Sequence, residues 1–330
     1  MAGRDEIAQA LWYMGPGRAE IREEKLGAPL AGAVRVRAMY GALSRGTEGL
    51  IFAGRVPASE FHRMRVPFMA GAFPFPVKYG YSTVGRVESG PRDLLGRAAF
   101  ALHPHQTLYD LPLGAVMPLP EDMPSSRAVL AANMETALNA VWDANLDPPS
   151  GTAGRIAVVG AGVVGALVGY LCGKIAGAEV TLVDIDPTRA EIAEAFGLRF
   201  AEPAAAPTEC PLVFHASATA AGLAVALHAA GDEATILELS WYGSGTVPVP
   251  LGGAFHSRRL KLVSSQVGRV APSHRAEWTH RRRLEAAIGL LRDPKLDILL
   301  ASAVNFRDLP AALPDILKPQ SGVLCQLIAY

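Results

Sequence analysis

The sequence predicts an α/β protein in which a parallel-sheet domain interrupts a β-rich domain. Residues 10–120 contain short strand patterns among glycine and proline turns. The segment Arg155–Asp184 has the pattern strand, glycine turn, helix and strand, and Val323–Ala329 returns to a strand pattern. A chain of 330 residues is long enough for about two domains.

Composition and charge exclude several classes of protein. Lys+Arg and Asp+Glu both number 31, so no net charge favours nucleic acid or an anionic membrane. Cys172, Cys210 and Cys325 are too far apart for a CxxC motif, and we expect them to be reduced and buried in a cytoplasmic protein. The start, MAGRDEIAQA, has acidic residues and no apolar stretch, so we expect no secretory signal.

The first 145 residues predict strands followed by a helix. Val34–Tyr40 alternates apolar and polar residues, as a half-buried strand does. Ser82–Glu88 and Ala98–Leu102 are further short strands. A connector leads to a helix at Ala128–Asp143, for which we expect Ser126 to be the cap.

The segment Arg155–Asp184, RIAVVGAGVVGALVGYLCGKIAGAEVTLVD, predicts a dinucleotide-binding βαβ unit. Gly160 permits a tight turn, Gly162 lets the backbone approach a pyrophosphate, and Gly165 lets the helix pack closely. The helix N-terminus offers N–H groups and partial positive charge to phosphates. The alternative is a membrane span, because residues 156–173 are uncharged, but their glycines and the acid-ended strand that follows argue against it.

Further elements of a parallel sheet follow Asp184. We expect a helix from Pro187 to about Phe196. A helix at Arg281–Leu291 begins with a basic run that we interpret as a solvated face. The expected strands are Leu212–His215, Thr235–Leu239 and Leu260–Ser265.

This order of elements resembles the medium-chain dehydrogenase/reductase superfamily, which has the alcohol-dehydrogenase-like fold. Arg45-Gly46-Thr47-Glu48 is similar to the family's Cys-Gly-Thr-Asp, and Gly80–Val87 (GYSTVGRV) is similar to its Gly-His-Glu-x-x-Gly-x-Val. Ala131–Trp142 resembles the helix that carries another metal ligand. The resemblance implies a GroES-like catalytic domain at 1–128 and 270–330, a Rossmann domain at 129–269, and a homodimer or homotetramer.

The departures from the family pattern concern zinc. The family's ligand cysteine, histidine and glutamate fall on Arg45, Tyr81 and Ser82, and its third ligand position falls near Ala132. None of these is a usual zinc ligand. The resemblance therefore implies a zinc-independent member, most similar to the branch that contains hydroxyethyl bacteriochlorophyllide dehydrogenase.

Two histidines leave a metal site open as an alternative. His103 and His105 are two residues apart, so on a strand they share a face, and Glu48 would complete a non-standard site. The interpretation that we favour has one loop histidine, one histidine that binds substrate or a hydrogen-bond partner, and no metal.

Asp184 predicts NAD(H) rather than NADP(H). In the family this position accepts hydrogen bonds from ribose hydroxyls, and a carboxylate there repels a 2′-phosphate. Asp186 adds to the repulsion, Ile185 intervenes, and the nearest arginine is Arg189. The alternative for Asp184 is a simple turn residue at a strand end. Further cofactor contacts are expected at Val163, Val164, Ala216, Ser217, Leu239, Ser240 and Trp241.

Without zinc, side-chain donors must activate the substrate. Tyr81 occupies the lost histidine position, and its phenol can donate a hydrogen bond and a proton. Thr47 matches the family's relay hydroxyl, whereas the relay histidine position falls near Leu50. The alternatives are a packed aromatic at Tyr81 and a plain turn hydroxyl at Thr47. The secondary candidates are Lys78, Glu48, His103, His105, Asn133 and Glu135. Each has a structural alternative, such as an Arg45–Glu48 pair or a solvated lysine.

Two functional classes remain open. The first is an NAD(H)-dependent oxidoreductase acting on a carbonyl, alcohol or activated alkene of a bulky or cyclic small molecule. The second is a catalytically silent NAD(H)-binding regulatory or partner protein. The loop Ala53–Tyr79 predicts an apolar lid for such a substrate, with a satellite core or subunit contact as the alternative. Its apolar residues are Phe61, Met64, Phe68, Phe73 and Phe75.

Overall fold

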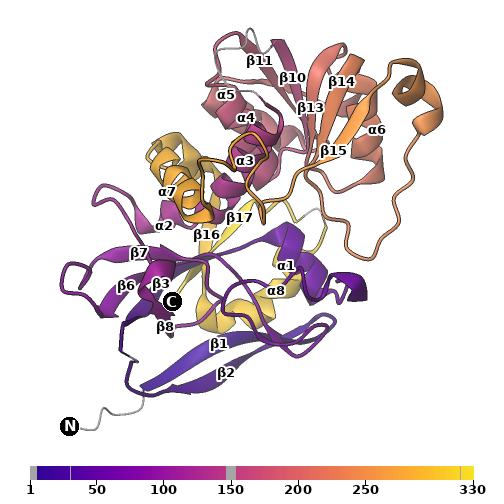
Figure 1. Cartoon of the computed structure of the whole chain (residues 1–330). Helices are drawn as coiled ribbons and strands as arrows, with labels where there is room; N and C mark the ends of the chain where they lie inside the picture. The colour runs from indigo at the N-terminus through magenta and orange to yellow at the C-terminus, as the bar shows by residue number, and fades with distance from the viewer. Residues whose placement is uncertain (1–5, 30, 146–153, 320) are drawn as a thin grey trace. The chain divides into compact units, whose positions relative to one another are not determined.

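The computed structural model describes residues 6–29, 31–145, 154–319 and 321–330, which divide into two compact units (Figure 1). The first unit runs to Ala132 and resumes at Leu300, and the second spans Asn133–Leu299. The expected fold class, a parallel-sheet α/β domain inserted in a β-rich domain, is confirmed. The sequence also predicts a loop at residues 148–154, before the first parallel strand, and all of it except Gly154 lies outside the described residues.

Residues 270–299 lie in the second unit, although the family resemblance assigned them to the first. The physical reason is a buried polar contact between α7 (His280–Leu290) and α3 (Ala131–Asp143). Arg283 of α7 is 1% exposed and donates to Glu135 and Asn139 of α3. A buried arginine needs such acceptors, so α7 must pack against α3.

The first unit is built on two sheets. One has the order β16-β17-β3-β6-β7-β9 with β8 paired to β3, and the other has the order β2-β1-β5-β4. In the larger sheet, Val34, Val36 and Ala38 fill one buried face, as their alternation predicted. The strands are β1 Glu6–Gly15, β2 Arg18–Leu26, β3 Ala33–Leu43, β4 Ala70–Gly71, β5 Val77–Lys78, β6 Thr83–Ser89, β7 Ala98–Ala101, β8 Leu108–Pro112, β9 Met117–Pro118, β16 Leu300–Asn305 and β17 Cys325–Ala329.

The helix expected at 128–143 is two helices, α2 (Ser125–Ala128) and α3. The expected cap at Ser126 is wrong, because Ser126 lies inside α2 and Pro124 precedes it. Ser82 Oγ donates to the Val129 carbonyl at 2.5 Å, which removes that acceptor at the break. Two further helices that sequence reasoning missed are α1 (Arg45–Phe52) and α8 (Leu309–Leu317).

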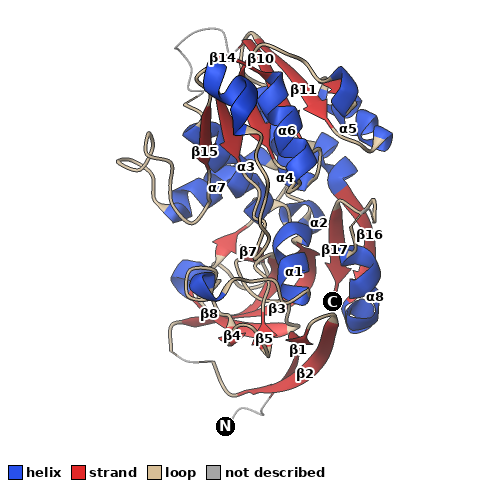
Figure 2. Cartoon of the chain, turned by 90° about the vertical axis from the view of Figure 1, so that its right-hand side faces the viewer, coloured by secondary structure: helices blue, strands red, loops and turns tan. Residues whose placement is uncertain are grey.

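The second unit is built on a parallel sheet, whose strands β10, β11, β14 and β15 are labelled in Figure 2. The order of the six strands is β12-β11-β10-β13-β14-β15. The strand order reverses between β10 and β13, where ligands collect in open α/β sheets. The strands are β10 Gly154–Val159, β11 Ala178–Val183, β12 Arg199–Ala201, β13 Cys210–His215, β14 Ala230–Glu238 and β15 Lys261–Ser264. The other helices are α4 Val163–Cys172, α5 Ala190–Phe196 and α6 Ala220–Ala229.

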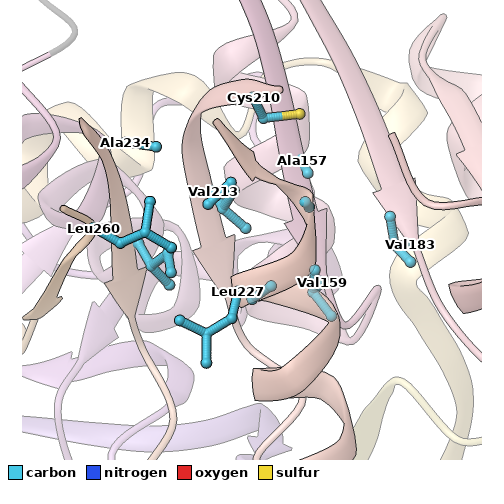
Figure 3. Close-up of a cluster of buried hydrophobic side chains, with 12 residues drawn as sticks. Ala157, Val159, Val183, Cys210, Val213, Leu227, Ala234 and Leu260 are labelled. Carbon is cyan, nitrogen blue, oxygen red and sulfur yellow. The ribbon is translucent and has the colours of Figure 1, made fainter. Parts of the chain in front are cut away.

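Helices cover both faces of this sheet. Leu227 of α6 packs with Val159 and Val213, in the core that Figure 3 shows. Gly169 of α4 lies against Leu182, which points to the opposite face from its neighbour Val183. The three cysteines are buried as expected. Within the described ranges, no helix is long and apolar enough to cross a membrane.

Candidate functional site

The glycine turn at the head of α4 combines two tight contacts with one open position. Gly160 has φ +101°, and a Cβ there would lie 2.6 Å from the Ser217 nitrogen. A Cβ on Gly165 would lie 1.9 Å from the Gly160 carbonyl oxygen. Gly162, by contrast, is exposed, a Cβ there would meet no atom within 4 Å, and no side chain caps α4. The turn thus presents open backbone at a helix N-terminus, which suits a phosphate group.

Asp184, at the end of β11, is bound to this turn. Its Oδ2 accepts from the Ala161 N–H at 2.7 Å, and its Oδ1 accepts from the Asp186 N–H at 2.9 Å. Each carboxylate oxygen keeps a second lone pair for a ligand hydroxyl. Beside it, Ile185 is 73% exposed, and Arg189 pairs with Asp186 at 3.2 Å.

The other expected cofactor residues lie on or beside the same edge of the sheet. Ala216 donates its N–H to the Val159 carbonyl at 2.8 Å, and Leu239 donates to the His215 carbonyl at 2.9 Å. The residues with partly exposed surface are Val163, Val164, Ala216, Ser217, Leu239, Ser240 and Trp241. This edge therefore has accessible surface at each predicted contact.

Sequence reasoning missed a polar network at this edge. His215 Nδ1 lies 2.7 Å from Glu238 Oε2, and His215 Nε2 lies 2.7 Å from Ser217 Oγ. The signal was available: Glu238 is an acid inside an apolar strand, and such a residue needs a partner.

In the first unit, Tyr81 lies among hydroxyl groups. Its phenol donates to Ser44 Oγ at 2.5 Å and also hydrogen-bonds Thr47. Burial raises the pKa of Tyr81 to about 12, and the hydrogen bonds to Ser44 and Thr47 only partly oppose this effect. The side chain keeps some exposed surface. Tyr81 is therefore a protonated donor at neutral pH.

Glu48 of α1 is the buried centre of a second group of contacts. Its Oε1 accepts from the Ser44 N–H at 2.8 Å. Its Oε2 accepts from the Tyr13 hydroxyl at 2.6 Å and lies 3.0 Å from His105 Nε2. Ser44 thus joins Tyr81 and Thr47 to Glu48 and His105, which brings four of the expected catalytic residues together. Ser44 and Tyr13 were not among the predictions, and no local pattern marks Tyr13.

Arg45 takes no part in this group. Its guanidinium donates to the carbonyls of Ile316, Lys318 and Val323 in the C-terminal segment. The alternative of an Arg45–Glu48 ion pair is therefore wrong.

Lys78 and His103 make their contacts elsewhere. Lys78 is buried and donates to Glu24 at 2.7 Å and to Gln106 at 2.8 Å. The alternative that Lys78 is a solvated surface lysine is therefore wrong. His103 stacks on Tyr109 at 3.9 Å between ring centroids and donates from Nδ1 to the Pro104 carbonyl. Burial lowers the pKa of His103 to about 3, so the ring is neutral. Both residues have structural partners.

The residues present do not match a zinc site of the family type. Ser82 gives its hydroxyl to the Val129 carbonyl, and Tyr81 gives its hydroxyl to Ser44. In the part of the chain that the structure describes, no three His, Cys, Asp or Glu side chains gather to hold a metal. His103 stacks with Tyr109, so it does not join the Glu48–His105 pair.

The aromatic residues of the loop 53–79 form a chain of contacts that ends at Tyr81. Ring centroids are 5.6 Å apart for Phe61 and Phe73, 5.8 Å for Phe73 and Tyr79, and 6.1 Å for Tyr79 and Tyr81. Phe73 is buried, whereas Phe68 is exposed and stacks on His103. The loop therefore has a core of its own, and its role as a lid stays a prediction.

Known proteins are similar to this chain mainly in structure. A profile of the family described as ketopantoate reductase PanE/ApbA matches residues 156–235, which run from β10 into β14. No curated protein matches the sequence.

Solved structures match nearly the whole chain. L-idonate 5-dehydrogenase from Escherichia coli K-12 matches with a TM-score of 0.78 and 13% identity, over 99% of each chain. A Sinorhizobium meliloti protein titled a zinc-binding dehydrogenase and bound to NADP has a TM-score of 0.76 and 15% identity, over 98% of this chain and 100% of that one. A short chain alcohol dehydrogenase from Escherichia coli CFT073, in complex with NADH, has a TM-score of 0.73 and 16% identity, over 98% of this chain and 99% of that one. The chain shares the fold of these proteins.

Proposed function

We propose that this protein is an NAD(H)-dependent oxidoreductase of the medium-chain type that works without a catalytic zinc. It transfers hydride between nicotinamide and a carbonyl, alcohol or activated alkene of a bulky or cyclic small molecule. The observation that carries the proposal is the glycine turn, because Gly162 leaves the N-terminus of α4 open to a pyrophosphate. A cytoplasmic homodimer or homotetramer is part of the same proposal.

Asp184 and Arg189 support NAD(H) over NADP(H). The Asp184 carboxylate offers lone pairs to ribose hydroxyls and repels a 2′-phosphate. Arg189, the nearest cation in sequence, is paired with Asp186. Two structural neighbours were solved with NADP and with NADH, respectively, so neighbours alone favour neither.

Bound nicotinamide would supply the hydride, and the chain's own residues would supply the proton. When substrate binds, the Tyr81 hydroxyl would turn its hydrogen from Ser44 Oγ to the substrate oxygen, and the Ser44 hydroxyl would donate to the phenol oxygen in its place. Tyr81 would then give its proton to the substrate oxygen, because its pKa of about 12 keeps it protonated. Ser44 and Thr47 orient the phenol. Glu48 is a positioning residue, since it holds the Ser44 N–H and not the phenol itself.

The test is steady-state NADH oxidation with a panel of quinones, enals and cyclic ketones. With an active substrate, Tyr81→Phe should lower kcat about 100-fold, because general-acid catalysis contributes at least that much. Tyr79→Phe is the matched control, because that hydroxyl donates to the Met64 carbonyl and leaves the Tyr81 phenol in place. An unchanged kcat in Tyr81→Phe would remove Tyr81 from the mechanism.

Two further outcomes separate the alternatives. Activity that is lost on exhaustive chelation and restored by zinc would contradict the zinc-independent mechanism. NADH binding with no turnover on any member of the panel would favour the silent NAD(H)-binding protein, whose support is the loss of the family's zinc ligands.

A further inference from the structure

Ser217, His215 and Glu238 have the geometry of a nucleophilic triad. His215 and Glu238 are register partners on the neighbouring parallel strands β13 and β14, so their side chains lie on one face of the sheet. The two nitrogens of the fully buried His215 ring lie 2.7 Å from Glu238 Oε2 and 2.7 Å from Ser217 Oγ. A serine, a histidine and a carboxylate in this order are recognised by such distances rather than by sequence position.

The surrounding contacts determine which atom donates and which accepts in the hydrogen bonds among Ser217, His215 and Glu238. Glu238 accepts from the Ser240 N–H at 2.7 Å and from the Tyr242 hydroxyl at 3.0 Å. Burial opposes the charge of Glu238, but the hydrogen bonds from His215 and Ser240 outweigh it and hold the pKa of the carboxyl below its usual range. A charged Glu238 requires His215 to carry its proton on Nδ1. Nε2 is then the acceptor, and the Ser217 hydroxyl donates to it.

The start of α6 lies beside the serine oxygen. The Thr219 N–H donates to Ser217 Oγ at 3.3 Å, and the hydroxyls of the two residues are 3.0 Å apart. The first helical hydrogen bond runs from the Leu223 N–H to the Thr219 carbonyl, so the N–H groups of Ala220 and Ala221 precede it. A Cβ on Gly222 would lie 2.0 Å from Ser217 Oγ, so the glycine makes room for the hydroxyl.

We propose that Ser217 is an activated nucleophile, with His215 as its general base and Glu238 as the group that orients the base, and that it accepts acyl groups from small activated esters. Ser217 Oγ bonds to the acyl carbon while its proton passes to His215 Nε2. The ester C–O bond breaks, and the leaving alcohol takes that proton. Water, activated by His215, then hydrolyses the acyl-serine to the free acid. The N–H groups of Ala220 and Ala221 are the donors that we assign to the developing oxyanion.

The experiment treats the full-length protein, free of added cofactor, with a fluorophosphonate and locates the adduct by peptide mass spectrometry. The P–F bond is replaced by a P–O bond to the serine, and fluoride leaves. We expect labelling at Ser217 that disappears in Ser217→Ala. In His215→Gln the labelling rate should fall about 100-fold. Ser257→Ala, at an exposed serine of the same unit, should label at Ser217 like the unaltered protein.

Further measurements keep the proposal falsifiable. Hydrolysis of p-nitrophenyl acetate should fall with labelling in the same variants, and thermal unfolding checks that each variant is folded. A protein that gains no adduct at Ser217, or a folded His215→Gln that labels at the original rate, would overturn the proposal. Because the label is read without nicotinamide or an oxidisable substrate, this result is independent of the proposed dehydrogenase function.

Discussion

The buried carboxylate of Glu48 allows a quantitative test of the contacts that hold the Tyr81 site. Glu48 is 0% exposed and faces the Ser44 N–H, the Tyr13 hydroxyl and the His105 ring at 2.8, 2.6 and 3.0 Å. Glu48→Ala leaves these groups, of which the Tyr13 hydroxyl and the His105 ring are buried and Ser44 is partly buried, without their acceptor. Each such group costs up to about 1–3 kcal/mol. We expect the free energy of unfolding to fall by about 4 kcal/mol, since water in the new cavity recovers part of the loss.

A double-mutant cycle isolates the contact between Tyr13 and Glu48. Tyr13→Phe alone removes one of three donors and should cost about 1.5 kcal/mol. Once Glu48 is alanine, Tyr13→Phe removes a hydroxyl that has already lost its acceptor. The free energy of unfolding should therefore fall by about 2 kcal/mol less in the double variant than the sum of the two single-variant losses.

The assay is urea unfolding at pH 7.5, followed by far-ultraviolet circular dichroism and by tryptophan fluorescence. The matched control replaces Tyr13→Phe with Tyr79→Phe, whose hydroxyl donates to the Met64 carbonyl. That cycle should be additive within about 0.5 kcal/mol. Additivity in the Tyr13–Glu48 cycle would refute the reasoning, because it would mean that the 2.6 Å contact contributes nothing to stability.

Two other predictions concern pH and cofactor choice. His103 has a pKa of about 3 when folded and about 6.5 when unfolded, so its contribution to stability is present above pH 6.5 and is lost as pH falls toward 3. Between pH 7 and pH 5 this loss lowers the free energy of unfolding in urea by about 2 kcal/mol. The variant His103→Phe should not show this loss, whereas the control His62→Phe, at an exposed histidine, should show it. The same dependence of stability on pH in both variants and the unaltered protein would contradict the prediction. Asp184→Ser should raise the ratio of NADPH affinity to NADH affinity about tenfold in fluorescence titrations. The substitution removes about 1.4 kcal/mol of repulsion between the carboxylate and the 2′-phosphate. An unchanged affinity ratio would mean that Asp184 does not face the ribose.

The parts of the fold with local signals were predictable from the sequence. The unit β10–α4–β11 was found because apolar strands, three glycines and an acid occur within thirty residues. Period-two alternation identified β3 in the same way. The helix expected at 128–143 was wrong at its start because Ser82, far away in sequence, binds the Val129 carbonyl. Local propensity contains no information about such a contact.

The candidate sites depend on contacts between distant residues. Tyr13 on β1 and Glu48 on α1 are 35 residues apart, and His105 and Glu48 are 57 apart. Lysine is usually solvated, yet Lys78 is buried because Glu24 and Gln106 accept its hydrogen bonds. These pairings follow from how the two sheets of the first unit are assembled. Sequence reasoning therefore grouped Glu48 with His105 only as an alternative metal site, and it did not propose the serine that joins this pair to Thr47 and Tyr81.

Calorimetric titration with NADH tests the central claim most directly, with Gly162→Val beside the unaltered protein. A Cβ at Gly162 meets no protein atom within 4 Å, so the variant should fold, and thermal unfolding checks that it does. The unaltered protein should bind NADH, and Gly162→Val should bind it at least about tenfold more weakly, because its side chain occupies the place of the pyrophosphate. No heat with the unaltered protein, or equal affinity in the folded variant, would contradict a dinucleotide held at this glycine turn.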